Sequence, residues 1–170
     1  MKIAIISDTH NNMANFKKAI DYIKGGGIKL ILHCGDIQSQ ETIDEAVKYF
    51  AAPKGEPRPE GRGGEIKFVK GNGDHGLEIP EKIEVEVGGK KIVFCHFPAD
   101  AKKLAQSGKY DLVFYGHTHR AWDEKVACLL SQGNTHMINP GELAGQFYKP
   151  TFAIYDTDSE KLELKILEKL

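Results

Sequence analysis

Two histidines, His117 and His119, stand two residues apart directly after an apolar run at residues 112–115. The run is typical of a buried parallel strand that ends at Gly116. A loop at the C-terminal end of such a strand can direct both side chains into one crevice, where open α/β sheets usually bind their ligands. Because imidazole is the commonest metal-coordinating side chain, the pair indicates a metal site if other segments supply further ligands.

Other segments end in the same way, with an apolar strand followed by a loop that carries Asp, Asn or His. If these strands run the same way in one sheet, their loops gather at one edge. The set then contains two carboxylates, one amide oxygen and four imidazoles: Asp8, His10, Asp36, Asn72, His96, His117 and His119. So many oxygen and nitrogen ligands exceed one tetrahedral site and suit two divalent ions that share a carboxylate.

Each segment also has an ordinary structural interpretation. An Asp after a strand is often a helix cap or a turn residue, Asn72 between two glycines is an ordinary turn, and His96 can be a hydrogen-bonded core histidine. The combination of all these segments, each at the end of a strand, favours the metal site. Neither a thiolate nor a Gly-rich phosphate loop of the P-loop type is part of the pattern.

The composition is that of an ordinary globular domain. The chain has 170 residues, 41% hydrophobic and 28% charged, with a net charge of -1. This charge argues against a broad nucleic-acid or membrane footprint; a nucleic-acid substrate stays open, but no basic stripe supports it. No apolar run has membrane-spanning length, and the first strand begins at once. Three unpatterned cysteines indicate a reducing compartment, so we expect a cytoplasmic protein, with no indication of its oligomeric state.

The first third of the chain alternates strands and helices. A strand at 3–7 precedes a helix with Met13, Phe16, Ile20 and Ile23 on one face, which Asn11 or Asn12 caps and the glycines at 25–27 end. A second strand at 29–33 precedes a helix that Ser39 can cap. The apolar face of this second helix is predicted to hold Ile43, Ala46, Val47 and Phe50. The alternation predicts an α/β fold with a parallel sheet.

The rest of the chain is predicted to be mainly strands. The segment 51–64, with three prolines and four glycines, is expected to be a flexible surface loop, or a lid over the site. A strand at 65–70, a hairpin at 83–95 around Gly88 and Gly89, a helix at 100–108 and a strand at 111–115 follow. Strands at 126–130 and 137–138 and a last hairpin at 151–166 complete one domain over residues 1–170.

The quoted motifs resemble those of the calcineurin-like metallophosphoesterases. They are Asp8-x-His10, Gly35-Asp36, Gly71-Asn72-x-Asp74, His96 and Gly116-His117-Thr118-His119, and Asn139-Pro140-Gly141-Glu142 resembles the small single-domain prokaryotic phosphodiesterase branch. The resemblance implies a four-layered α/β/β/α sandwich with two divalent transition metal ions, whether Mn, Ni, Fe or Zn. It assigns one ion to Asp8, His10, His119 and the bridging Asp36, and the other to Asp36, Asn72, His96 and His117.

The sequence departs from the family at one place that bears on substrate choice. Many members have a histidine, read as the proton donor, directly after the motif asparagine, where this chain has Gly73. His75 is a candidate substitute, although a shift of two residues rarely preserves geometry. In the family, loss of that histidine tends to accompany diesterase activity. His96 is followed by Phe97 instead of the commoner glycine, which narrows the rim of the site.

The resulting hypothesis is a dinuclear metal-dependent phosphodiesterase acting on a small phosphodiester or a nucleotide-like substrate. Two ions about 3.5–4 Å apart would hold a bridging hydroxide that attacks phosphorus in line. Asp36, Asn72 and His75 are the candidate catalytic residues, and Asn72 and Arg120 the candidate substrate contacts, although Arg120 can equally be a solvated surface arginine. The alternatives are a phosphomonoesterase or nucleotide pyrophosphatase on the same site, and a non-catalytic protein-binding scaffold, against which the complete ligand set argues.

Overall fold

The computed structural model describes residues 1–51, 63–129 and 132–170, whose strands form two sheets. The first sheet has the order β10-β9-β1-β2-β3. It contains β1 (Lys2–Ile6), β2 (Leu30–His33) and β3 (Glu65–Phe68), which are parallel, and the antiparallel pair β9 (Thr151–Asp156) and β10 (Lys161–Ile166). A short 3-10 helix, η1 (Leu167–Lys169), follows β10.

The second sheet has the order β4-β5-β6-β8-β7. Its central strands β5 (Lys90–Cys95), β6 (Leu112–Phe114) and β8 (Asn134–Asn139) are parallel. The outer strands β4 (Lys82–Val87) and β7 (Trp122–Ala127) are antiparallel to their neighbours. The sequence argument that placed all the ligand-bearing strands in one sheet was therefore wrong, because β5 and β6 belong to the second sheet.

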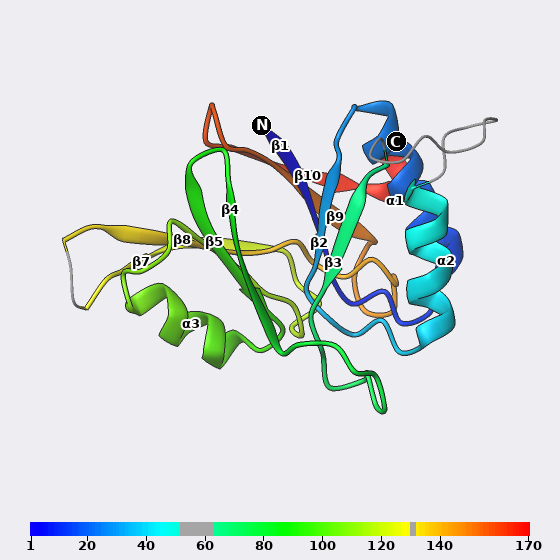
Figure 1. Ribbon diagram of the computed structural model, residues 1–170, viewed down its shortest axis with the longest axis horizontal. Coiled ribbons are helices and arrows are strands. Elements are labelled where there is room, and N and C mark those ends of the chain that lie inside the picture. Colours follow the sequence, from blue (N-terminus) through cyan, green and yellow to red (C-terminus); the bar gives the residue numbers. More distant parts are fainter. Residues whose placement is uncertain (52–62, 130–131) are drawn as a thin grey trace.

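In the described part of the chain, three α-helices cover the outer faces of the sheets. In Figure 1, α1 (Met13–Gly25) and α2 (Gln40–Ala51) lie beside the first sheet, and α3 (Pro98–Gln106) lies beside the second. Alternate strand residues face opposite ways, so Ala4 and Ile6 of β1 pack with the helices, whereas Ile3 and Ile5 pack between the sheets. Val93 of β5 belongs to a third apolar layer that contains residues of α3. The chain is thus the four-layered α/β/β/α sandwich that the resemblance implied.

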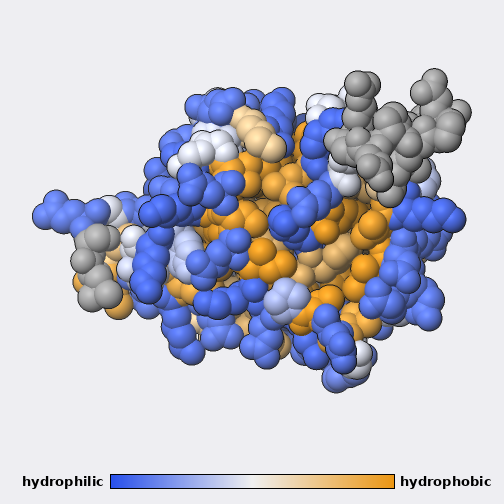
Figure 2. All heavy atoms as spheres, viewed as in Figure 1, coloured by the Kyte–Doolittle hydropathy of each residue, from blue (hydrophilic) through white to orange (hydrophobic). Residues whose placement is uncertain are grey.

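The middle apolar layer reaches the surface where the two sheets lie side by side. Figure 2 shows apolar residues in the centre of this face, surrounded by hydrophilic ones. The outer strand β4 carries the half-buried Ile83 and Val85 of this layer, and Ile66 on the outer strand β3 packs against the layer between the first sheet and its helices.

Helix signals in the sequence are confirmed with one exception. The Asn12 side chain accepts a hydrogen bond from the backbone nitrogen of Asn15 (3.1 Å), and Ser39 Oγ accepts one from that of Thr42 (3.2 Å). Val47, which was predicted to lie on the buried face of α2, is 40% exposed. At about 100° per residue, the buried arc of α2 is centred between Ala46 and Phe50, and Val47 is rotated out of it.

Element boundaries differ most at β7, which begins at Trp122 and not at residue 126. Asp123, Glu124 and Lys125 have no apolar alternation, because both faces of this outer strand meet solvent. Most of the loop predicted at 51–64, including its interpretation as a lid, lies outside the described residues, and Ala51 ends α2.

Among the described residues, no helix combines the length and the apolar character that crossing a bilayer requires. A cytoplasmic location stays a prediction.

Candidate metal centre

The loops that follow β1, β2, β3, β5 and β6 meet at one end of the sandwich, in the lower middle of Figure 1. Hydrogen bonds join the loops of the two sheets here. His96 Nδ1 lies 2.8 Å from the carbonyl oxygen of Cys34, and the backbone nitrogen of His117 donates to the carboxylate of Asp8 at 3.1 and 3.2 Å. The predicted convergence is therefore real, although it is built from two sheets.

Glycines in the motifs allow these loops to approach so closely. A Cβ atom on Gly116 would lie 1.9 Å from Ser7 Oγ and 2.8 Å from Asp8 Oδ2. A Cβ atom on Gly71 would lie 2.2 Å from Asp36 Oδ1, and one on Gly35 would lie 2.6 Å from His96 Nδ1. Each of these glycines sits against a candidate ligand, so a larger residue would displace it.

One group of donors surrounds the end of β1. Its ligand atoms all lie within 4.8 Å of one another and come from Asp8, His10, Asp36 and His119. His119 Nε2 is 3.4 Å from His10 Nε2 and 3.4 Å from Asp8 Oδ1, and His10 Nε2 is 3.8 Å from Asp36 Oδ2. Four donors at about 2.0–2.2 Å from a tetrahedral ion are about 3.3–3.6 Å apart, so the spacing fits a metal ion.

A second group adjoins the first through Asp36. His96 Nε2 lies 3.6 Å from Asp36 Oδ1 and 3.0 Å from Asn72 Oδ1. His117 Nδ1 lies 2.8 Å from the same Asn72 oxygen. The structure thus brings together all seven residues that the sequence singled out as candidate ligands, in two groups that use the two oxygens of Asp36.

The outer nitrogens of three imidazoles have partners that fix the ring orientation. His119 Nδ1 is 3.0 Å from Glu142 Oε2, His96 Nδ1 contacts the Cys34 carbonyl oxygen, and His10 Nδ1 is 2.8 Å from the side-chain amide of Gln38. Each ring then presents Nε2 to the centre. Such outer partners are the usual companions of metal-binding histidines.

Burial shapes the charge of the site. It raises the pKa of Asp8 to about 7, with a further rise from the nearby carboxylate of Asp36. Burial also lowers the pKa values of His10 and His96, which keeps their rings neutral and their lone pairs available. A cation between the groups would favour the ionised form of Asp8 and bind neutral imidazoles, so the electrostatics fit a metal site.

Two buried acids organise the loops and were not assigned roles from the sequence. Asp74 is fully buried, and its carboxylate accepts hydrogen bonds from the backbone nitrogens of Asp36 (2.9 Å), Ile37 (2.7 Å), Gln38 (2.6 Å) and Gly71 (2.8 Å). Glu142, also fully buried, accepts from the backbone nitrogens of residues 146–148 as well as contacting His119. The only signal in the sequence was their place in the Asn-x-Asp and Asn-Pro-Gly-Glu motifs.

The backbone is left-handed at most of the candidate ligands. The φ angles are positive at Asp8 (52°), His10 (45°), Asp36 (58°), His117 (68°) and His119 (60°). Such conformations cost about 1–3 kcal/mol each for residues other than glycine, and they cluster at functional sites.

The remaining predicted site residues lie at the margin. His75 is exposed, and within the described residues no hydrogen bond or ring contact joins it to the ligands. The exposed Arg120 places its guanidinium carbon 5.5 Å from the Trp122 ring centre. Gly73 donates its backbone nitrogen to Asp36 Oδ1 at 2.7 Å. The roles predicted for His75 and Arg120 stay predictions.

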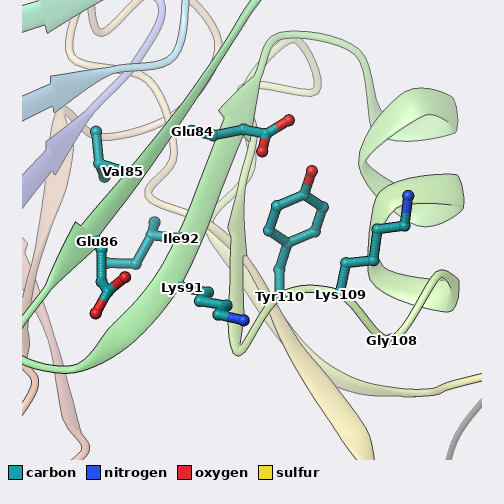
Figure 3. A pocket seen from close by; sticks show the side chains of 8 residues that line it. All are labelled: Glu84, Val85, Glu86, Lys91, Ile92, Gly108, Lys109 and Tyr110. Atoms are coloured by element: carbon teal, nitrogen blue, oxygen red, sulfur yellow. The ribbon is translucent and has the colours of Figure 1, made fainter.

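A separate depression lies on β4 and β5 (Figure 3), away from all the candidate ligands. Acidic and basic side chains alternate along it, among them Glu84, Glu86, Lys91 and Lys109. Burial and a hydrogen bond to Glu84 raise the pKa of Tyr110, which also lines it, to about 12. With its charges mixed in this way, the depression has no converging set of reactive groups.

The chain belongs to the calcineurin-like phosphoesterase superfamily, whose domain model matches residues 1–160. It is 33% identical to Phosphodiesterase MJ0936 of Methanocaldococcus jannaschii over 99% of this chain and 100% of that protein. A solved archaeal phosphodiesterase superposes with a TM-score of 0.79 at 29% identity, covering 98% of this chain and 99% of the other.

Another solved structure with a similar fold is Vps29 of Entamoeba histolytica, complexed with zinc, with a TM-score of 0.65 and 20% identity over 96% of this chain and 90% of that one. This likeness shows the shared fold alone. The family and the more similar relatives support a metal-dependent phosphoesterase, and the described site contains donors for the metal.

Proposed function

We propose that the chain is a dinuclear metal-dependent phosphodiesterase, acting as one domain over residues 1–170. The observation that carries the proposal is the double use of Asp36. Its Oδ2 faces His10 in one donor group, and its Oδ1 faces His96 in the other. A carboxylate with a ligand set on each side suits two adjacent divalent ions.

The donors divide between two ions. Asp8, His10, His119 and Asp36 would hold one, and Asp36, Asn72, His96 and His117 the other. Bound there, the ions would lower the pKa of a water molecule and stabilise negative charge on the phosphate oxygens. The oxygen and nitrogen donors suit manganese, nickel, iron or zinc.

The chain's own residues orient the site. Gly73 donates its backbone nitrogen to Asp36 and thereby fixes the shared carboxylate. Asn72 is exposed, so its amide nitrogen is available to a phosphate oxygen while its Oδ1 faces His96 and His117. Asp74 holds the two loops together through backbone amides. These contacts position the ligands before substrate binds.

The absence of a side chain at Gly73 supports diesters as substrates. Hydrolysis adds the oxygen of water to phosphorus and breaks the bond from phosphorus to the leaving oxygen, which gives a monoester and an alcohol or phenol. An alkoxide needs a proton as it departs, and a general acid contributes about 10²–10⁴-fold. An aryloxide departs as a stable anion, so an activated diester loses little without that acid.

The test compares two chromogenic esters with a common leaving group. Protein stripped with a chelator should be inactive, and manganese or nickel should restore hydrolysis of bis-para-nitrophenyl phosphate in preference to para-nitrophenyl phosphate, measured as kcat/KM. Asp8→Asn should abolish the recovery, whereas Asp44→Asn on the exposed face of α2 should behave as wild type. A preference for the monoester would contradict the proposed substrate class.

A further inference from the structure

The phenylalanines of the chain fall into two groups by exposure. Of eight, six are buried in the apolar layers, with at most 8% of their surface exposed: Phe16, Phe50, Phe68, Phe94, Phe114 and Phe152. Phe97 is 39% exposed and Phe147 is 74% exposed. Both exposed rings touch candidate metal ligands, so their exposure coincides with the site.

Phe97 flanks the second donor group. Its ring centre lies 5.0 Å from that of His96 and 5.1 Å from that of His117, with the ring planes steeply inclined in both pairs. The main chain holds this position, because Phe97 is the N-cap of α3, its carbonyl oxygen accepts from Ala101 (3.0 Å), and Pro98 follows directly.

Phe147 flanks the first donor group. Its ring centre lies 5.0 Å from that of His119, with the planes nearly perpendicular at 82°. The buried carboxylate of Glu142 accepts a hydrogen bond from the backbone nitrogen of Phe147 at 2.6 Å and also contacts His119 Nδ1. One buried acid therefore fixes both a ligand and the adjacent ring.

Neither ring owes its place to the core. An exposed phenylalanine gains little from burial, and each is nevertheless held beside the ligands by backbone hydrogen bonds. Beside their contacts with the histidines, the two rings keep the exposed surface noted above, which is free for a ligand. Flat aromatic groups stack on such surfaces.

We propose that Phe97 and Phe147 stack against planar rings on the two ester groups of the substrate, one on either flank of the phosphate. The preferred substrate is then a phosphodiester with an aromatic or nucleobase ring on each arm. This inference rests on the proposed phosphodiesterase function, which would supply the phosphate position between the two rings.

Kinetics test the inference with diesters that share the para-nitrophenolate leaving group. They differ in the group that stays on phosphorus: a methyl group, a para-nitrophenyl group or a thymidine. The ratio of kcat/KM for each ring-bearing diester to that for the methyl diester should fall about fivefold in the leucine variant, Phe97→Leu or Phe147→Leu, that lacks the ring beside the retained group. The other leucine variant lacks the ring beside the common leaving group, so it should lower kcat/KM about fivefold for all three diesters. The diesters differ in intrinsic reactivity, but this difference cancels when the ratio in a variant is compared with the ratio in wild type. Tyr22→Leu, a 37%-exposed aromatic on α1, is the matched control and should keep the wild-type ratio.

Binding gives a second readout that needs no turnover. Diphenylphosphinate has the single negative charge of a diester, two rings and no ester bond, and dimethylphosphinate is its ring-free counterpart. By calorimetry on the metal-loaded protein, each leucine variant should bind diphenylphosphinate about fivefold more weakly than wild type does, with dimethylphosphinate unchanged. Metal content should stay at the wild-type value in both variants.

The outcomes separate the two proposals. If wild type hydrolyses no diester with any metal, the phosphodiesterase proposal fails, and the phosphinate titration still decides whether the rings bind aromatic groups. If diesters are hydrolysed but either leucine variant keeps both the wild-type ratio and the wild-type phosphinate affinity, the two-sided stacking proposal is overturned. That result would assign the exposed ring to another task, such as contact with a protein partner.

Discussion

Asp36 is the residue on which both donor groups depend. Its carboxylate is almost fully buried, its oxygens face His10 and His96, and its Oδ1 also accepts a hydrogen bond from Gly73. His10 takes part in the first donor group alone. The two residues should therefore affect metal binding differently.

Metal content should separate their effects. Asp36→Asn keeps an acceptor for the Gly73 amide but removes the shared negative charge, so we predict weakened binding at both positions and fewer than one ion per chain. His10→Ala should chiefly empty one position. Elemental analysis after saturation with manganese and desalting measures this. Equal losses in the two variants would show that Asp36 is not shared.

Gly73 is the residue that sets the expected substrate preference. A Cβ atom there would lie 3.3 Å from Asp36 Oδ1 and 3.5 Å from Gln38 Cγ, and no positive φ restricts the position. A side chain is thus accommodated with small shifts. His75, the other candidate acid, is exposed and lies two residues further along the chain.

Restoring a histidine should change the balance between esters. Gly73→His should raise monoesterase activity relative to diesterase activity, since it returns an acid to the leaving oxygen. His75→Ala should change the diesterase kcat/KM by less than about tenfold, or about 1.4 kcal/mol. The comparison uses the mono- and bis-nitrophenyl esters. A wild-type monoester preference that His75→Ala abolishes would make His75 the acid.

At the scale of single residues, the sequence singled out the candidate ligands but not the residues that support them. Asp8, Asp36 and the histidines stand out because each follows an apolar strand. The roles of Asp74 and Glu142 depend on backbone amides that fold around them, and the partners of Asp74 include residues 36–38 earlier in the chain. Side-chain type and spacing do not encode such contacts.

At the scale of elements, the loops that follow the strands carry the candidate ligands. Several of them pass through left-handed conformations at the candidate ligands themselves, as at His117 (φ 68°). Asn72 is an exposed candidate ligand without a positive φ. Substitutions at His117 and at Asn72 both remove a candidate ligand, but only those at His117 change a residue with a positive φ. Comparing the two positions therefore separates backbone strain from the loss of side-chain contacts.

We predict that, in metal-free protein, His117→Gly is more stable than His117→Ala by about 1 kcal/mol, because glycine adopts a positive φ without strain. At Asn72 the glycine variant should be no more stable than the alanine variant, because glycine relieves no strain there and only increases the entropy of the unfolded chain. Chemical denaturation of the four variants measures the difference. A preference for alanine at position 117 would mean that the left-handed turn stores no strain.

Strand and helix types were readable from periodicity, and their assembly was not. The continuous apolar run from Ile3 to Ile6 is typical of a strand that is buried on both faces. The run does not indicate which sheet the strand joins. That β5 and β6 belong to a second sheet follows from pairings such as Val93 with Val113. The resemblance to the family, and not the pattern, gave the four layers.

At the scale of the whole molecule, His33 links stability to pH. It is fully buried in β2, its ring lies between Phe16 and Phe68, and Nε2 is 2.6 Å from Thr9 Oγ1. Burial lowers its pKa to about 3, against about 6.5 in the unfolded chain. Its contribution to stability is therefore complete above pH 6.5. It declines as the pH falls toward 3, because only the unfolded chain takes up the proton.

Between pH 7 and pH 5, His33 should remove about 2 kcal/mol from the unfolding free energy of the metal-free protein. Asp8 acts in the opposite direction, because its pKa is raised to about 7 in the folded state. Comparing wild type with His33→Gln isolates His33, since both proteins carry Asp8. The variant should lose less stability on acidification. If both proteins lost the same unfolding free energy, a group other than His33 would be responsible for the loss.

We propose that the two sheets together hold two metal ions, one in each donor group around Asp36. A crystal structure of the protein grown with manganese, with anomalous scattering recorded at the manganese edge, tests it most directly. We predict two anomalous peaks per chain, one among Asp8, His10, Asp36 and His119 and the other among Asp36, Asn72, His96 and His117. A single peak at saturating manganese would contradict the dinuclear account.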